Sequence, residues 1–182
     1  MTGPRGAPAR ILVAYASGFG STAEVARAIG DALSSANARV DVASVADIED
    51  VTPYDAVIVG SPIRYDKWMP EATGFVERFA SDLKDRPVAL FFTCLALSRE
   101  DDRSARQARS YADRLREGIS GVRPLDVAGF AGVLDYSRFP VLVRPFARFL
   151  FSFLRVREGD YRNWDAIGEW AGSLKQNPEW PS

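Results

Sequence analysis

Short apolar runs alternate along the chain with longer amphipathic stretches. The runs within 10–16, 54–61 and 86–93 are almost continuously apolar, which is typical of strands buried inside a parallel sheet. The segment 38–45 alternates between apolar and polar residues and predicts an outer strand, and 123–134 predicts a fifth strand. The pattern therefore predicts a sheet whose central strands are covered on both faces.

The stretches between these strands carry apolar residues at helical spacing. Within 21–34, Val25, Ile29 and Leu33 recur every four residues. Three further helical patterns are a stripe of Phe75, Val76, Phe79 and Leu83, a charged helix at 103–118, and a last helix at 164–175 with Asn163 as its N-cap. Strands that alternate with helices predict right-handed βαβ units and a doubly wound α/β fold.

The loop after the first strand is rich in glycine and hydroxyl groups. In a doubly wound sheet, ligands bind where strand ends meet helix N-termini, and a helix N-terminus offers N–H groups to phosphate. An alternative is an ordinary turn, in which Ser21 and Glu24 form an S-x-x-E capping box. The candidate phosphate-binding residues of this first loop (residues 17–22) are Ser17, Gly18, Phe19, Gly20, Ser21 and Thr22.

Three kinds of nucleotide loop compete for this sequence. A Walker loop needs a Gly-Lys-Ser/Thr step, and the first loop has no lysine. A dinucleotide loop is compatible with the G-x-G-x-x-A spacing from Gly18 to Ala23, although the acidic partner Asp41 falls inside the second predicted strand. The density of hydroxyls favours a terminal monophosphate, a dianion that accepts several O–H and N–H donors.

Composition and charge narrow the function classes. A length of 182 residues predicts one domain, and a net charge of −1 gives no general bias toward nucleic acid. The absence of histidine excludes Ser-His triads and imidazole metal sites within this chain, so we expect no metal. Residues 1–9 lack the apolar core of a signal peptide and predict a disordered leader before a single domain at 10–177. We therefore expect a cytoplasmic protein.

The first loop resembles the FMN-phosphate loop of the flavodoxin family, T/S-x-T-G-x-T. Ser17, Gly20 and Thr22 match this pattern, whereas Phe19 stands where the middle threonine belongs. The resemblance implies a flavodoxin-like five-stranded parallel sheet with the strand order 2-1-3-4-5 and non-covalently held FMN. The departure at Phe19 leaves open a related domain that has lost FMN.

The same resemblance assigns roles to the loops after the third and fourth strands. In flavodoxins the third-strand loop, here within 60–72, places an aromatic or apolar side chain against the isoalloxazine ring. Tyr65 is favoured because it follows the strand closely, whereas Trp68 either stacks on the ring or packs on the next helix. Without a histidine to activate it, Cys94 is a packing residue rather than a nucleophile. The candidates in the two loops are Pro62, Ile63, Arg64, Tyr65 and Trp68, then Thr93, Cys94 and Leu95.

Several longer pieces resemble the menaquinone-dependent protoporphyrinogen IX dehydrogenase family. They are "GSPIRY", "FFTCLALSRE", "GFAGVLDYSRF" and "YRNWDAIGEWA". That family also has a Gly-Gly-Glu-Thr-Asp-Thr stretch, where this chain reads "RVREGDYRN". The resemblance implies an FMN oxidoreductase of heme biosynthesis that acts on a porphyrinogen-like substrate and reduces a quinone. The alternative is a flavodoxin-type electron carrier that serves redox protein partners and has no substrate of its own.

A basic apolar segment at 139–156, within a predicted insert at 136–160, departs from the strand–helix alternation. Its prolines and arginines exclude a transmembrane span. Between 136 and 157 there are five arginines and no acid, which favours contact with an anionic surface. That surface is either the inner face of a membrane or the carboxylates of a porphyrin-like substrate, while a plain core-covering helix is the alternative. The candidate contacts are Arg138, Arg144, Arg148 and Arg155.

Overall fold

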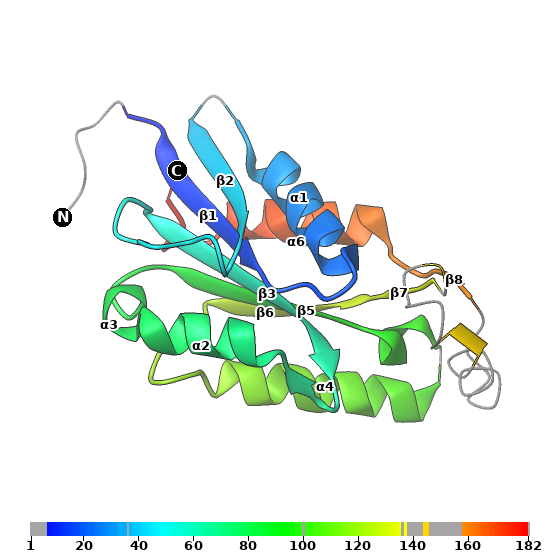
Figure 1. Cartoon of the computed structure of the whole chain (residues 1–182). Coiled ribbons are helices and arrows are strands. Elements are labelled where there is room, and N and C mark those ends of the chain that lie inside the picture. The colour runs from blue at the N-terminus through cyan, green and yellow to red at the C-terminus, as the bar shows by residue number, and fades with distance from the viewer. Residues whose placement is uncertain are drawn as a thin grey trace.

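A sheet of parallel strands forms the middle layer of the protein (Figure 1). The computed structural model describes residues 7–35, 37–99, 101–135, 137, 144–145 and 158–181. The parallel strands are hydrogen-bonded in the order β2-β1-β3-β5-β6, which confirms the predicted 2-1-3-4-5 arrangement. They are β1 (Ala9–Tyr15), β2 (Ala38–Ser44), β3 (Ala56–Arg64), β5 (Val88–Cys94) and β6 (Asp126–Ala131).

Three short strands lie outside this parallel order. β4 (Lys67–Trp68) pairs antiparallel with the end of β3, so β3 runs past the predicted strand end at residue 61. β7 (Val133–Leu134) and β8 (Gly159–Asp160) form a separate antiparallel pair. The predicted fifth strand at 123–134 is confirmed as β6, but it is shorter than predicted, because β6 ends at Ala131 and the chain leaves the main sheet at Gly132.

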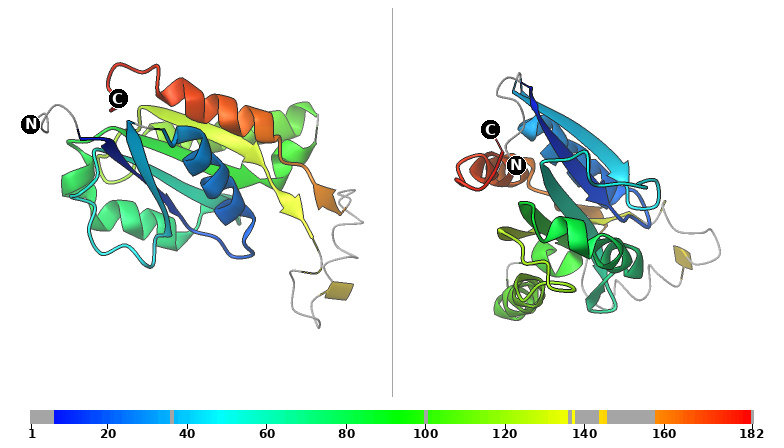
Figure 2. Two further views of the ribbon diagram at one scale, coloured as in Figure 1. Left: turned by 90° about the horizontal axis from the view of Figure 1, so that it is seen from above. Right: turned by 90° about the vertical axis from the view of Figure 1, so that its left-hand side faces the viewer.

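Helices cover both faces of the sheet, as Figure 2 shows along two further directions. α1 and α6 lie on one face, and α2, α3 and α4 lie on the other. Asn163 caps α6 as predicted, since its side chain accepts a hydrogen bond of 3.0 Å from the Ala166 N–H. The helices are α1 (Ser21–Leu33), α2 (Pro70–Arg78), α3 (Ala80–Leu83), the 3-10 helix η1 (Leu95–Ser98), α4 (Asp102–Arg116) and α6 (Trp164–Leu174).

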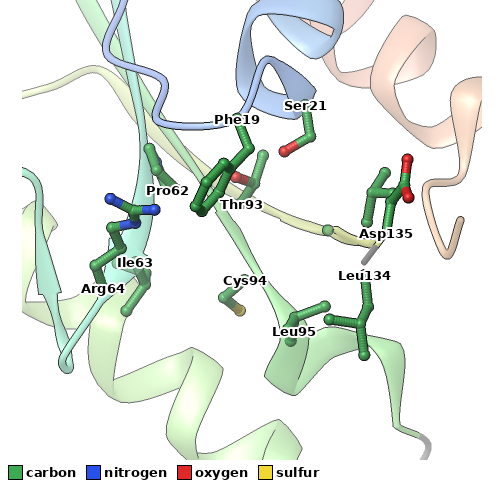
Figure 3. A pocket seen from close by; sticks show the side chains of 12 residues that line it. Phe19, Ser21, Pro62, Ile63, Arg64, Thr93, Cys94, Leu95, Leu134 and Asp135 are labelled. Atoms are coloured by element: carbon green, nitrogen blue, oxygen red, sulfur yellow. The ribbon is translucent and has the colours of Figure 1, made fainter. Parts of the chain in front are cut away.

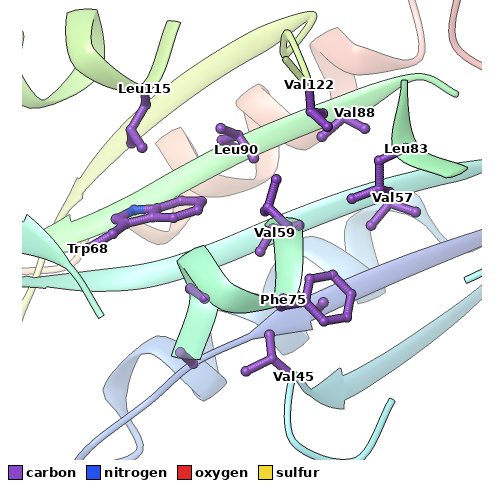
Figure 4. Close-up of a cluster of buried hydrophobic side chains, with 14 of the residues drawn as sticks. Val45, Val57, Val59, Trp68, Phe75, Leu83, Val88, Leu90, Leu115 and Val122 are labelled. Atoms are coloured by element: carbon purple, nitrogen blue, oxygen red, sulfur yellow. The ribbon is translucent and has the colours of Figure 1, made fainter. Parts of the chain in front are cut away.

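Each face of the sheet carries its own apolar core. Phe92 belongs with Trp68 and Phe75 to the cluster on the side of α2 and α4, and Figure 4 shows Trp68 and Phe75 within it. Phe91, the neighbour of Phe92, points to the α1 and α6 side, because successive strand residues face opposite ways. A Cβ atom at Gly60 would lie 1.9 Å from the Phe91 ring, so this end of β3 has no room for a side chain.

Most of the predicted insert lies outside the described residues. This holds for Arg138, Arg148, Arg155 and most of the basic apolar segment at 139–156. Arg144 is described, and its Nη2 donates a 2.8 Å hydrogen bond to the Ser137 carbonyl. Among the residues that the structure describes, no helix has the length and apolar character needed to cross a bilayer.

Candidate cofactor site

The first loop joins β1 to α1 and exposes the start of that helix. Gly20 takes a left-handed conformation with φ 87°, and no side chain caps the helix. The Ser17 Oγ instead accepts a 3.0 Å hydrogen bond from the Gly20 N–H. The capping-box alternative is therefore wrong, because Ser21 is already the first helical residue. The first N–H groups of α1 have no carbonyl within the helix and so can bind a phosphate.

Thr22 ties this loop to the end of β5. Its side chain is buried, and its Oγ1 lies 2.9 Å from the Oγ1 of Thr93. Each hydroxyl has one hydrogen to donate, so a single bond between the two leaves one hydrogen for another acceptor. The pair holds the loop against the sheet, and direct contact of Thr22 with a phosphate remains a prediction.

A pocket opens beside this loop, at the ends of β1, β3 and β5 (Figure 3). Pro62, Ile63 and Arg64 lie on one side of it, and Leu95 and Leu134 lie on the other. Eight residues predicted for the cofactor line it: Phe19, Ser21, Pro62, Ile63, Arg64, Thr93, Cys94 and Leu95. Gly132, Val133, Leu134 and Asp135 also line it, and the sequence does not predict them, because the apolar pattern of β6 continues into β7 without a break.

Arg64 packs across the first loop. Its guanidinium carbon lies 4.8 Å from the centroid of the Phe19 ring, in a cation–π arrangement. A Cβ atom at Gly18 would come within 2.8 Å of Nη2, so the glycine makes room for the guanidinium. Within the described part of the chain, Arg64 forms no ion pair with an acid. The pocket rim thus carries a positive charge beside a helix N-terminus.

Tyr65 lies at the tip of a tight hairpin formed by β3 and β4 (residues 63–68). Arg64 pairs with Lys67, which leaves Tyr65 and Asp66 as the turn residues, both with positive φ, as a type I′ turn requires. Tyr65 is 99% exposed and does not line the pocket. Its predicted contact with the flavin stays a prediction, although the side chain lies outside the pocket wall.

Trp68 follows the packing alternative. Its side chain is only 7% exposed and belongs to the core cluster that includes Ala72 and Phe75 of α2. It does not line the pocket beside the first loop, so its assignment as a stacking residue is corrected. Trp68 pairs with Ile63 in the hairpin, and the strand direction turns it toward the core.

The hairpin is anchored to α4 through Asp66. The Tyr111 hydroxyl donates a short hydrogen bond to Asp66 Oδ1, and Gln107 Nε2 donates to the same oxygen at 3.0 Å. These bonds lower the pKa of Asp66 because they stabilise its carboxylate. Burial, and then the hydrogen bond to Asp66, raise the pKa of Tyr111 to about 12. The hairpin is thus fixed on the side away from the first loop.

Arg162 is a further site neighbour that the sequence did not reveal. Its side chain is 6% exposed and forms ion pairs of 2.5 Å with both Glu24 and Asp160. The guanidinium carbon also lies 4.3 Å from the centroid of the Trp164 ring. Hydrogen bonding to Asp160 raises the pKa of Arg162. Arg162 therefore joins the segment after β8 to the first turn of α1.

The Cys94 thiol, at the pocket wall, and the Asp41 carboxylate, away from it, both take packing or pairing roles. Cys94 is buried, and burial raises the pKa of its thiol, which agrees with a packing role. Asp41 lies within β2 and forms a 3.3 Å ion pair with Arg10. A dinucleotide loop needs an acid at the end of that strand for the ribose, so the dinucleotide alternative lacks its partner.

Comparisons with known proteins agree with this geometry. The family model described as "Flavodoxin domain" matches residues 12–160. Protoporphyrinogen IX dehydrogenase (quinone) of Escherichia coli (strain K12) is 26% identical over 184 aligned positions, which cover 95% of this chain and 98% of that protein. NAD(P)H dehydrogenase (quinone) of Caulobacter vibrioides (strain NA1000 / CB15N) is 30% identical over 91 positions, which cover 38% and 46% of the two chains.

Solved structures share the fold. The solution structure of two-electron reduced Megasphaera elsdenii flavodoxin aligns with a TM-score of 0.53 at 20% identity, covering 90% of this chain and 98% of that one. A short-chain flavodoxin associated with a non-canonical PDU bacterial microcompartment aligns with a TM-score of 0.51 at 15% identity, covering 80% and 98%.

The residues at the pocket fit FMN. The uncapped start of α1 and the Arg64 guanidinium supply donors and positive charge for a phosphate, and the walls near Ile63 and Leu95 supply apolar surface for a flat ring. The family match covers most of the chain and includes all three strand ends that form the pocket. The protein is therefore a flavoprotein with FMN as its cofactor, and the chain belongs to the flavodoxin domain family.

Proposed function

We propose that this protein is an FMN-dependent oxidoreductase that takes electrons from a porphyrinogen-like substrate and passes them to a quinone. The observation that carries the proposal is the similarity to a protoporphyrinogen IX dehydrogenase along 95% of the chain. The pocket beside the first loop is compatible with it. Bound FMN would supply the electron-transfer chemistry, and the protein would hold and orient the cofactor.

The first loop would bind the phosphate end of FMN. Ser17, Gly18, Phe19, Gly20, Ser21 and Thr22 form this end of the site. Its donors would be the N–H groups at the start of α1 and the hydroxyls that remain free to donate. The flavin ring would lie between the walls formed by residues 62–64 and 93–95.

Arg64 would replace the donor that Phe19 lacks. The flavodoxin pattern has a threonine hydroxyl at position 19, whereas this chain has a phenyl ring there. The ring instead supports a guanidinium that packs over Gly18. A guanidinium is always charged and binds phosphate oxygens strongly, so the exchange would keep the site suited to a dianion.

The basic segment remains a candidate contact for an anionic partner. Arg138, Arg144, Arg148 and Arg155 would face either the carboxylates of the substrate or the headgroups of a membrane. The second case would place the protein in the cytoplasm as a peripheral membrane protein. Of these four arginines, the structure describes Arg144 alone. The proposal therefore rests on the charge pattern of residues 136–157.

The deciding experiment is anaerobic oxidation of protoporphyrinogen IX by the FMN-loaded protein with a water-soluble quinone. Parallel assays would replace protoporphyrinogen with NADH or NADPH, and the quinone with a redox protein. Turnover that needs both the porphyrinogen and the quinone is the expected result. Electron exchange with redox proteins alone, without porphyrinogen oxidation, would contradict it and favour an electron carrier.

A charge-matched pair of variants would test the basic segment. Changing Arg144, Arg148 and Arg155 to glutamine should lower porphyrinogen turnover, binding to anionic vesicles, or both. The control changes Arg103, Arg106 and Arg109 to glutamine, which removes the same charge from the exposed side of α4. Equal behaviour of the two variants would show that only net charge matters.

A further inference from the structure

A second cavity lies between the hairpin at residues 63–68, the start of α2, and α4. Its volume is about 350 Å³, within the usual range for small-molecule sites. Its lining is mostly apolar, and Lys67 and Arg114 add positive charge. Ile63 lines both this cavity and the cofactor pocket. A ligand here would therefore lie one side chain away from the cofactor. The lining residues include Ile63, Lys67, Trp68, Tyr111, Arg114 and Leu115.

Trp68 lines this cavity, and its indole N–H is a buried donor. The side chain is 7% exposed, and its Nε1 has no hydrogen-bond partner within the described part of the chain. Figure 4 shows the indole beneath Leu115, with the ring nitrogen on the edge nearer that residue. Leu115 itself lines the cavity. An acceptor that reached Nε1 would satisfy a buried donor that has no partner among the described residues.

Two polar groups of the cavity, the Asp66 carboxylate and the Tyr111 hydroxyl, already bind each other. Tyr111 and Gln107 both donate to Asp66, and Gln107 also donates to the Tyr111 oxygen at 2.6 Å. The Arg114 guanidinium carbon lies 5.1 Å from the centroid of the Tyr111 ring. These contacts fix one wall of the cavity with paired groups, whereas the buried Trp68 N–H has no partner among the described residues. A flat apolar ring that carries a carbonyl oxygen would match this lining. The ring would pack on the aliphatic side chains, and the oxygen would accept a hydrogen bond from the indole N–H.

We propose that this cavity binds the ring of a quinone, with one carbonyl oxygen accepting a hydrogen bond from Trp68 Nε1. The ring would lie against Ile63, Leu115 and Ile119, on the side of the hairpin opposite the cofactor pocket. The positive charges of Lys67 and Arg114 would favour an electron-rich carbonyl oxygen at this place. The proposal rests on the proposed function for its choice of a quinone over other carbonyl-bearing rings.

The test follows the indole N–H signals of the ¹⁵N-labelled, FMN-loaded protein during titration with 2,3-dimethyl-1,4-naphthoquinone. This probe has both ring positions substituted, so it does not add to the Cys94 thiol. The signal that disappears in Trp68→Phe should shift on titration. The signal that disappears in Trp180→Phe should stay in place, although Trp180 Nε1 is buried and unpartnered in the same way within the described residues.

Binding constants give a second readout. Trp68→Phe should weaken quinone binding roughly 3- to 10-fold, the usual contribution of one neutral hydrogen bond, whereas Trp180→Phe should leave it unchanged. Leu115→Phe should block binding by filling the cavity while the Trp68 signal remains as a reporter. This variant keeps the test decisive even where Trp68→Phe destabilises the fold.

Three outcomes would overturn the proposal. One is a probe that perturbs the flavin spectrum without moving the Trp68 signal. Another is binding of 2-naphthoate, but not of the quinone, with loss on Arg114→Gln, which would indicate an anionic ligand. The third is unchanged quinone affinity in Leu115→Phe. Failure of porphyrinogen oxidation alongside a Trp68 shift would instead contradict the proposed function and leave the quinone site in place.

Discussion

The first loop (residues 17–22) and the hairpin (residues 63–68) border the same pocket, but the chain builds them differently. The loop works through its backbone, where Gly20 turns the chain and α1 begins without a side-chain cap. The hairpin works through the direction of its side chains, since Ile63 lines the pocket, Tyr65 lies at the tip and Trp68 is in the core. A site built from backbone groups tolerates a side-chain exchange such as phenylalanine for threonine at position 19. In the hairpin, a shift of the strand pairing by one residue would turn every side chain to the opposite face and so change every contact.

The largest expected effect separates the two aromatic residues of the hairpin. Trp68→Ala should lower the free energy of unfolding by about 3–5 kcal/mol, as for other large residues removed from a core. Tyr65→Ala should change it by less than about 0.5 kcal/mol, because the side chain is exposed. Urea unfolding of both variants measures the difference. A comparable loss in Tyr65→Ala would contradict the placement of Tyr65 at a solvent-exposed tip.

Removal of Arg162 tests the contact between the first turn of α1, directly after the first loop, and the segment after β8. Arg162→Ala takes away the guanidinium shared by Glu24 and Asp160, and we expect a loss of about 2–3 kcal/mol in unfolding free energy. This is less than for a fully buried pair, because both carboxylates remain partly exposed. The control Arg116→Ala breaks an exposed pair with Asp113 and should cost less than about 1 kcal/mol. Equal losses would show that burial does not strengthen the Arg162 pairs.

A double-variant cycle on FMN affinity tests whether Arg64 replaces the missing hydroxyl. Arg64→Gln should weaken FMN about tenfold or more, the usual value of a charge-assisted hydrogen bond. Riboflavin, which has no phosphate, should bind the variant and the parent equally. Phe19→Thr restores the family hydroxyl and should recover part of the affinity lost in Arg64→Gln. Equal weakening of riboflavin would place the guanidinium at the ring instead of the phosphate.

Thr22 provides a smaller effect on the same readout. Thr22→Ala removes one hydroxyl of the Thr22–Thr93 pair, and we expect a several-fold loss of FMN affinity together with about 1 kcal/mol of stability. Thr22→Ser keeps the hydroxyl and should retain most of both. Fluorescence titration with FMN and thermal unfolding separate the two effects. A loss of stability without any change in affinity would assign Thr22 to the fold alone.

These contrasts explain what the sequence could predict. The apolar runs predict the strands, and the end of the first strand predicts the position of the first loop. Both therefore follow from the apolar pattern of the sequence. β4 has only two residues and no apolar run, so nothing in the pattern predicts the pairing of Ile63 with Trp68. Without that pairing, the burial of Trp68 is not predictable. The ion pairs of Arg162 are not predictable either, because its two partners, Glu24 and Asp160, lie far from each other in the sequence.

The smallest expected effect concerns the pKa of Tyr111, which reports how firmly the hairpin is held on α4. The raised pKa means that folding favours the neutral phenol, so its contribution to stability is present below pH 10.0 and is lost as the pH rises toward about 12. Asp66→Asn removes the negative charge beside the hydroxyl and should lower this pKa. Because burial is the larger cause, the value should stay above 10.0.

Tyrosinate absorbance measures the change, and Tyr111→Phe identifies the signal. The control Asp113→Asn alters an acid of the same helix that pairs with Arg116 and should leave the titration unchanged. An unchanged pKa in Asp66→Asn would mean that Asp66 does not hold the hairpin in solution, and the wall shared by the two pockets would then lack this anchor.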